Sequence, residues 1–115
     1  MSMIIVTGGA GLIGSALIWG FNQRGRSDIV VVDDVDHPEK EKNLRPLKYE
    51  KLVGIREFRE ELKAGLTPSV ATDGASAILH MGALSSTFEK NWERLQELNV
   101  SYTQAVIQWA VKNTI

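Results

Sequence analysis

The sequence predicts an α/β fold in which a parallel sheet carries helices on both faces. Two runs, Met3–Thr7 and 29–33, are almost wholly apolar before the closing aspartate, as strands buried on both faces are. A helix-forming stretch at 15–24 lies between them, and parallel strands need a crossover of this kind. With further apolar runs downstream, we expect an incomplete Rossmann-like sheet of about three to four strands.

Three glycines, Gly8, Gly11 and Gly14, follow the first strand at intervals of three residues. We expect Gly8 to let the chain leave the strand through a backbone conformation that a side chain opposes. Gly11 lets backbone amides and the positive end of the next helix approach a pyrophosphate, and Gly14 lets that helix pack closely on the strand. The pattern indicates a dinucleotide-binding turn.

The second strand supports this interpretation. It ends at Asp33, about twenty residues after the glycines, where a ribose diol needs an acceptor. A glycine-rich surface turn without a ligand is the alternative. The succession of strand, turn, helix, strand and acid favours the nucleotide site.

The segment 34–51 breaks the apolar pattern with a run of charged residues and two prolines. We expect a loop beside the adenosine end of the nucleotide, with Asp34 and Lys40 near the ribose or the adenine. A short third strand is predicted at 49–53. It is followed at 55–66 by an amphipathic surface helix without chemical function.

A further apolar run at 77–81 predicts another buried strand, and the small-residue loop 82–87 follows it. Ligands of open α/β sheets bind at the carboxyl ends of the strands, so this loop could border a nicotinamide ribose and a substrate; an ordinary strand-to-helix connection is the equal alternative. His80 lies within the strand and is expected to be a hydrogen-bonded core residue. The stretch 91–113 predicts a long helix, on which Asn99 either reaches the cofactor or is a surface amide.

Length and composition limit the range of functions. The 115 residues amount to one domain, and thirteen basic against fourteen acidic residues give a net charge of −1 without a basic block, so a nucleic acid partner is not expected. There is no cysteine and there are only two histidines, so we expect neither disulfides nor a metal site. The longest apolar runs are strand-sized. We therefore expect no signal peptide, no membrane span and a cytoplasmic location.

The motifs resemble those of the extended short-chain dehydrogenase/reductases that act on nucleotide sugars. The resemblance rests on segments 6–15, 31–34, 80–87 and 98–100 and extends over essentially the whole chain. Within this family the sequence is most similar to the ADP-L-glycero-D-manno-heptose 6-epimerases, through the loop 82–87. The resemblance implies NAD(P)-dependent epimerisation of a nucleotide-activated sugar. An open sheet edge also leads us to expect self-association into a homo-oligomer.

The resemblance assigns cofactor contacts to individual positions. The residues expected to contact the dinucleotide are Gly8, Gly11, Leu12, Ile13, Gly14, Asp33, Asp34, Lys40, Met81, Gly82, Ala83, Leu84, Ser85 and Asn99. Lys40 matches a position that meets the 2′-phosphate of NADP in such epimerases. Asp33 favours NAD, because its charge repels that phosphate. We expect a slight preference for NADP over NAD.

No catalytic residue is expected in this chain. Family members transfer the proton with a Tyr-x-x-x-Lys pair, whereas here Tyr49 is followed at the fourth position by Val53 and Tyr102 by Val106. We interpret residues 1–115 as the amino-terminal part of a dinucleotide-binding domain, inactive alone and without the substrate domain. Another nucleotide-sugar epimerase or dehydratase and a non-catalytic nucleotide-binding module remain open as alternatives.

Overall fold

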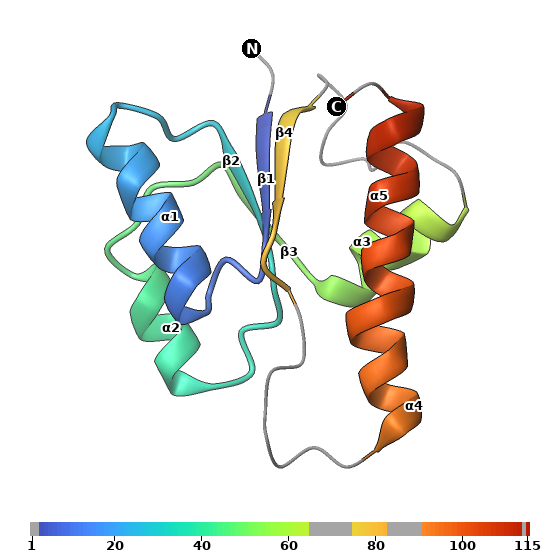
Figure 1. Cartoon of the computed structure of the whole chain (residues 1–115). Helices are drawn as coiled ribbons and strands as arrows, with labels where there is room; N and C mark the ends of the chain where they lie inside the picture. Colours follow the sequence, from blue (N-terminus) through green and yellow to red (C-terminus); the bar gives the residue numbers. More distant parts are fainter. Residues whose placement is uncertain (1–2, 65–74, 83–90, 114) are drawn as a thin grey trace.

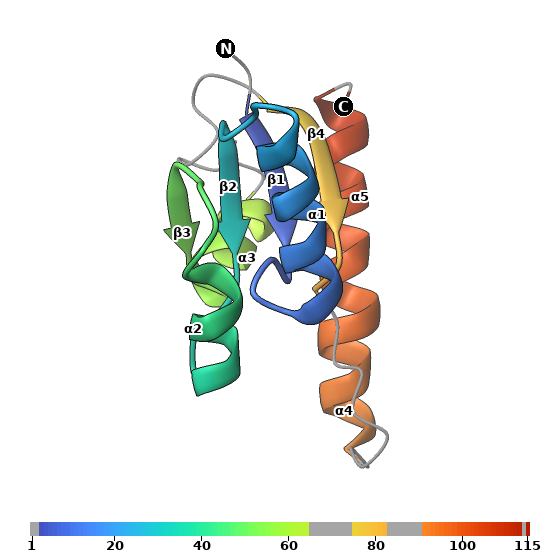
Figure 2. The same ribbon diagram turned by 90° about the vertical axis from the view of Figure 1, so that its left-hand side faces the viewer.

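The computed structural model describes residues 3–64, 75–82, 91–113 and 115. Its centre is a four-stranded sheet in the order β3-β2-β1-β4, in which neighbouring strands are parallel. The strands are β1 (Met3–Thr7), β2 (Ile29–Val32), β3 (Lys51–Val53) and β4 (Ala75–His80). Figure 2 shows them side by side, with their carboxyl ends at the same edge. The predicted parallel α/β fold is confirmed.

Helices cover both faces of the sheet. The helical elements are α1 (Leu12–Gln23), α2 (Pro38–Leu44), α3 (Ile55–Lys63), α4 (Trp92–Leu95), the π-helical turn η2 (Gln96–Ser101) and α5 (Tyr102–Lys112). Figure 1 shows α1 and α2 on one face and α3 and α5 on the other, which makes three layers. Among the described helices, none combines the length and the apolar character needed to cross a membrane.

The two central strands send their side chains alternately into two apolar cores. On the side of α3 and α5, Ile5 and Val30 are buried together with Phe58. On the side of α1 and α2, Ile4 is buried together with Ile18. Because neither face of these strands meets water, both strands are apolar throughout.

Most predicted elements are present, with shifted ends. Helix α1 begins at Leu12, three residues before the predicted start, and β4 covers Ala75–His80 where 77–81 is predicted. The third strand is shorter than predicted and covers only Lys51–Val53. The predicted long helix is present as α4, η2 and α5 in succession, and its π-helical turn has no signal in the apolar pattern.

One prediction is wrong, because the segment 34–51 is not a loop throughout but contains α2. His37 caps this helix, since its Nδ1 accepts a hydrogen bond from the N–H of Glu39 at 3.3 Å. Pro38 takes the first helical position, where a missing N–H removes no helical bond. Glu39 adds a negative charge beside the positive end of the helix. These three features are typical of a helix start. They are hard to identify in the sequence because the segment is charged and has no apolar periodicity.

Self-association of the chain stays a prediction, and the sheet edges and the exposed apolar side chains are the features that bear on it. Strands β3 and β4 lie at the two edges. Several large apolar side chains face the solvent, among them Trp19, Trp92 and Val111, which are 58%, 71% and 74% exposed. Exposed apolar surface of this kind is often covered by another chain.

Replacing Phe58 by alanine should lower the free energy of unfolding by about 3–5 kcal/mol. Its side chain is fully buried and lies edge-on to the ring of Tyr102, with the ring centroids 6.5 Å apart. Truncation therefore leaves a cavity beneath α3 and α5. Urea unfolding followed by circular dichroism measures the loss, and Phe58→Leu provides a milder variant if the alanine variant does not fold.

The matched control is Val111→Ala on the exposed side of α5, which should change the free energy of unfolding by less than about 0.5 kcal/mol. Equal losses at Phe58 and Val111 would contradict the position of the core.

Candidate functional site

The turn between β1 and α1 has a shape that requires glycine at two positions. Gly8 has a φ angle of +66°, in the left-handed region that other residues rarely adopt. A Cβ atom at Gly14 would lie 2.2 Å from the carbonyl oxygen of Gly8, so α1 can approach the turn only without a side chain there. Both glycines thus have the backbone roles that their spacing predicts.

The amino terminus of α1 is open. Gly11 is its N-cap, no side chain among the described residues caps the helix, and its first turn carries no acidic residue. Leu12 and Ile13 are 82% and 61% exposed. The first N–H groups of a helix have no partner within the helix and lie at its positive end. Among the described residues, a Cβ atom at Gly11 would have only the oxygen of Gly8 within 4 Å, at 3.3 Å. This open, amide-lined cradle suits a phosphate group.

Hydrogen bonds from two other elements hold the glycine turn at Ala10, which is fully buried. The N–H of Ala10 donates to Oδ2 of Asp33 at 2.9 Å, and its carbonyl oxygen accepts from Nδ2 of Asn43 at 2.9 Å. Asp33 follows β2, and Asn43 belongs to α2. Asn43 is a site residue without a signal in the sequence, because its position depends on α2, whose start is hidden within a run of charged residues.

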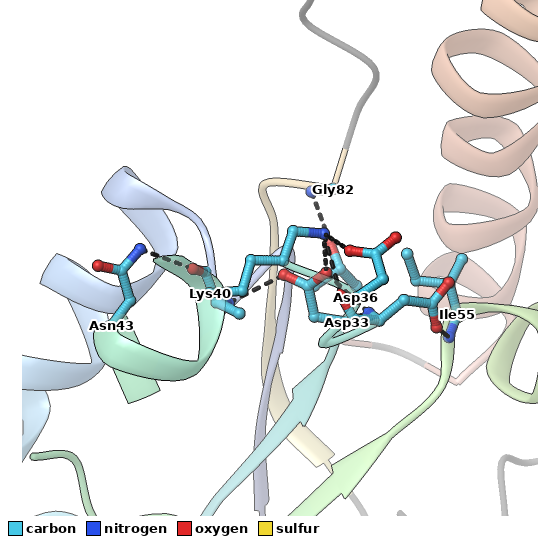
Figure 3. Close-up of polar contacts among 9 residues, drawn as sticks. Asp33, Asp36, Lys40, Asn43, Ile55 and Gly82 are labelled. Atoms are coloured by element: carbon cyan, nitrogen blue, oxygen red, sulfur yellow. Dashed lines mark hydrogen bonds and ion pairs between the residues drawn. The ribbon is translucent and has the colours of Figure 1, made fainter. Parts of the chain in front are cut away.

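Lys40 extends from α2 over the carboxylate of Asp33 (Figure 3). Its Nζ lies 3.0 Å from Oδ1 of Asp33, 3.0 Å from the carbonyl oxygen of Asp34 and 3.3 Å from Oδ1 of Asp36. Burial acts to lower the pKa of Lys40, but the carboxylates of Asp33 and Asp36 outweigh it and raise that pKa. The hydrogen bond from Lys40 in turn lowers the pKa of Asp36. The predicted site residues Asp33 and Lys40 therefore form an ion pair.

The two consecutive aspartates after β2 have different surroundings. The side chain of Asp33 is only 4% exposed, and its Oδ1 also accepts from the N–H of Asp34 at 2.8 Å. The carboxylate of Asp34 accepts from the N–H of Ile55 at 3.1 Å. Ile55 is the first residue of α3, so this hydrogen bond satisfies a free N–H group at the start of that helix. This bond joins residues 21 positions apart and has no signal in the sequence.

The carboxyl end of β4 lies against the glycine turn. The N–H of Met81 donates to the carbonyl of Thr7 at 3.1 Å, and the N–H of Gly82 donates to its hydroxyl at 3.0 Å. A Cβ atom at Gly8 would lie 2.7 Å from the carbonyl carbon of Met81. Met81 and Gly82 therefore lie beside the turn. The other predicted residues of this loop, which lie outside the described residues, are Ala83, Leu84 and Ser85.

His80 joins β4 to β1 and α5 through its two ring nitrogens. Nδ1 lies 2.6 Å from the hydroxyl of Thr7, and Nε2 lies 3.1 Å from the hydroxyl of Thr103. The Thr7 oxygen also accepts from the N–H of Gly82, and burial lowers the pKa of His80, so its ring carries a single proton at neutral pH. The Thr103 hydroxyl donates to the carbonyl of Asn99 at 2.9 Å, so it accepts from Nε2. The bonds select a neutral ring with its proton on Nε2, in the hydrogen-bonded core role that the sequence predicts.

Asn99 lies within the π-helical turn η2, a type of turn that is frequent at functional sites. Its carbonyl is linked through Thr103 to His80, and through His80 to Thr7 at the glycine turn. The predicted site residue Asn99 is therefore connected to the turn, although by its backbone carbonyl.

Within the described residues, no group of three or more side chains of the metal-binding types comes together. The ring of Tyr102 is buried, and burial raises the pKa of its phenol. This tyrosine therefore stays protonated at neutral pH and packs in the core.

Comparison with known proteins shows similarity over nearly the whole chain. The family model of the 3-beta hydroxysteroid dehydrogenase/isomerase family matches residues 5–115. The ADP-L-glycero-D-manno-heptose-6-epimerase of Fusobacterium nucleatum is 36% identical over 113 residues, which are 98% of this chain and 33% of that protein. The protein of the same name from Nitratidesulfovibrio vulgaris is 41% identical over 106 residues, which are 92% of this chain and 32% of that protein. The chain thus spans about a third of the length of these relatives.

A solved structure with the same fold is that of a short-chain dehydrogenase/reductase superfamily protein from Agrobacterium tumefaciens, which contains bound NAD. Its TM-score is 0.68 at 28% identity, and the match covers 98% of this chain and 30% of that protein. The chain therefore has the fold of a protein that holds a nicotinamide dinucleotide.

The half-buried position of His80 predicts a loss of stability in mild acid. Burial lowers the pKa of His80, so the folded protein favours the neutral ring, whereas the unfolded chain takes up a proton near pH ~6.5. The unfolded state then binds more protons, and the free energy of unfolding falls as the pH decreases from about 6.5 towards the lowered pKa of the folded state.

Urea unfolding of the wild type and of His80→Gln at about pH 7.5, 6.5 and 5.5 tests this. The variant should be less stable at the highest pH and should lose less stability on acidification. Val111→Ala, at an exposed position of α5, is the control and should keep the pH dependence of the wild type. The same dependence in all three proteins would show that His80 does not cause it.

Proposed function

Because the chain belongs to the 3-beta hydroxysteroid dehydrogenase/isomerase family, among the extended short-chain dehydrogenase/reductases, we propose that it binds a nicotinamide dinucleotide as the cofactor-binding part of a nucleotide-sugar epimerase. The identities of 36% and 41% to two ADP-L-glycero-D-manno-heptose-6-epimerases favour an ADP-activated heptose as the substrate. The residues of this chain would then form most of the cofactor half of the enzyme.

The observation that carries the proposal is the uncapped start of α1 above a turn that requires Gly8 and Gly14. A helix that begins without a capping side chain leaves amide hydrogens unpaired, and a pyrophosphate is a ligand that can pair with them. Ala10 is held on both sides by Asp33 and Asn43. These two bonds fix the shape of the cradle.

Each part of the site has a separate role in this proposal. The first amides of α1 and the backbone at Gly11 hold the pyrophosphate, and Asp33 accepts from the adenosine ribose. Met81 and Gly82 border the nicotinamide half. When bound, a nicotinamide cofactor takes a hydride from a substrate carbon and returns it. The residues of this chain bind and orient the cofactor, and they include no Tyr-x-x-x-Lys pair for proton transfer.

Replacing Gly11 by valine should weaken the binding of NAD and leave the fold intact. Gly11 has an extended backbone, with φ −77° and ψ 176°, which valine also adopts. Its side chain would enter the space beside the first amides of α1. Since a hydrogen bond to a charged group contributes about 1.5–3 kcal/mol, we expect the dissociation constant to rise roughly 10- to 100-fold. Isothermal titration calorimetry of the 115-residue chain with NAD measures the change.

The matched control is Gly20→Ala in the same helix, where a Cβ atom would have no neighbour within 4 Å in the described part of the chain. This variant should be more stable than the wild type by about 0.5–1 kcal/mol and bind NAD equally well. If Gly11→Val folds and binds NAD as tightly as Gly20→Ala, the turn is not the pyrophosphate site.

A further inference from the structure

We propose that the outer edge of β3 and the groove beside it form an interface with a second copy of this chain, in which the two β3 strands pair as antiparallel neighbours. The interface does not use the glycine turn, so the inference does not depend on nucleotide binding. It narrows the predicted self-association to one edge of the sheet, because β3 rather than β4 carries the contact.

The first observation is the position of β3 in the sheet. It has β2 as its neighbour on one side and, among the described strands, none on the other. Figure 2 shows β3 on the outer side of the sheet, beside β2. In the usual Rossmann strand order, 3-2-1-4-5-6, the third strand stays at the edge when further strands follow the fourth. Backbone groups at such an edge can pair with a strand of another chain.

The second observation is a groove along this edge, on the face of the sheet that carries α2. Its volume is about 530 Å³, and its lining reaches from Ser27, which precedes β2, to Val35, which follows it. The groove therefore runs along the strands. A strand paired with β3 would place every second side chain on this face of the sheet, and the groove has room for those side chains.

The floor of the groove is apolar and partly exposed. Leu52 on β3 is 43% exposed, and Val35 is 39% exposed. Leu44 and Leu47 also line the groove. Because Val53 belongs to the core on the side of α3 and α5, alternation places Leu52 on the opposite face, towards the groove. Covering these side chains removes apolar surface from water, which favours association.

The charges around the groove point to a copy of the chain as the partner. Its charged lining residues are Glu41, Arg45, Lys48 and Glu50, whose formal charges cancel. In a two-fold symmetric contact the same patch meets itself, and a patch with an excess of one sign would repel its copy. An acidic or a basic peptide would instead require such an excess. The balanced lining therefore favours a second copy.

Two of these four charges are available for pairing between copies. Glu41 and Arg45 pair with each other at 3.2 Å. In the described part of the chain, neither Lys48 nor Glu50 forms an ion pair, and both residues are exposed. A two-fold contact brings the positive charge of one copy and the negative charge of the other to the same interface.

Sedimentation velocity of the 115-residue chain over a series of concentrations tests the interface. The wild type should change from monomer to dimer as the concentration rises. Leu52→Glu places one negative charge from each copy in the contact and should raise the dimer dissociation constant at least about tenfold. Ile107→Glu is the matched control, because Ile107 is 55% exposed and lies on α5, on the other face of the sheet. This control should keep the dissociation constant within about twofold of the wild type.

A charge exchange tests whether the groove meets its own copy. Glu50→Lys changes the lining from two negative and two positive charges to one and three, a net charge of +2, and Lys48→Glu gives a net charge of −2 by the same count. Either variant alone should dimerise more weakly than the wild type. An equimolar mixture of the two should associate about three- to tenfold more tightly than either alone, because the grooves then carry opposite charges.

A wild type that stays monomeric at every concentration would overturn the inference and leave the groove to another occupant, such as an extended peptide. Equal losses of association in Leu52→Glu and Ile107→Glu, or a mixture that associates no better than its two components, would also overturn it. Hydrogen exchange at the amides of β3 should slow as the dimer forms, and unchanged exchange there would count against the strand pairing. Titration of NAD into the same samples tests the proposed function separately.

Discussion

The buried carboxylate of Asp33 is the interaction on which the rest of the site depends. It accepts from the N–H of Ala10 in the glycine turn, from the N–H of Asp34 and from Lys40 on α2. A charge with only 4% of its side chain exposed is tolerable only because it has these partners. One side chain at the end of β2 thereby fixes the glycine turn and places the lysine. The same atoms that order the apo protein are those proposed to meet the ribose.

A second set of bonds joins the other side of the turn to the rest of the sheet. The hydroxyl of Thr7 accepts from Gly82 and donates to His80, and His80 continues the connection to Thr103 and the carbonyl of Asn99. The glycine turn is therefore held from β2 and α2 on one side and from β4 and α5 on the other. A displacement of any of these elements would move the glycine turn, which is the proposed pyrophosphate site.

The parts of this arrangement that the sequence predicts are those encoded locally. The apolar strands and the spacing of Gly8, Gly11 and Gly14 are contiguous patterns, and the structure confirms the fold they indicate. The bonds that were not predicted join distant positions. Lys40 meets Asp33 because α2 forms, and a run of charges conceals the start of that helix. The hydroxyl of Thr7 meets His80 across 73 positions of sequence, a distance at which residue spacing carries no signal.

The order of the strands also determines how the chain can fold as it leaves the ribosome. Strand β1 pairs with β2 on one side and with β4 on the other, so its first edge can be paired once residue 32 has emerged, whereas its second edge waits for residues 75–80. At about 5–20 residues per second, synthesis of the intervening forty or so residues takes roughly 2–8 s. During that interval the nascent protein carries an unpaired edge at a central apolar strand, and such an edge can pair with other chains.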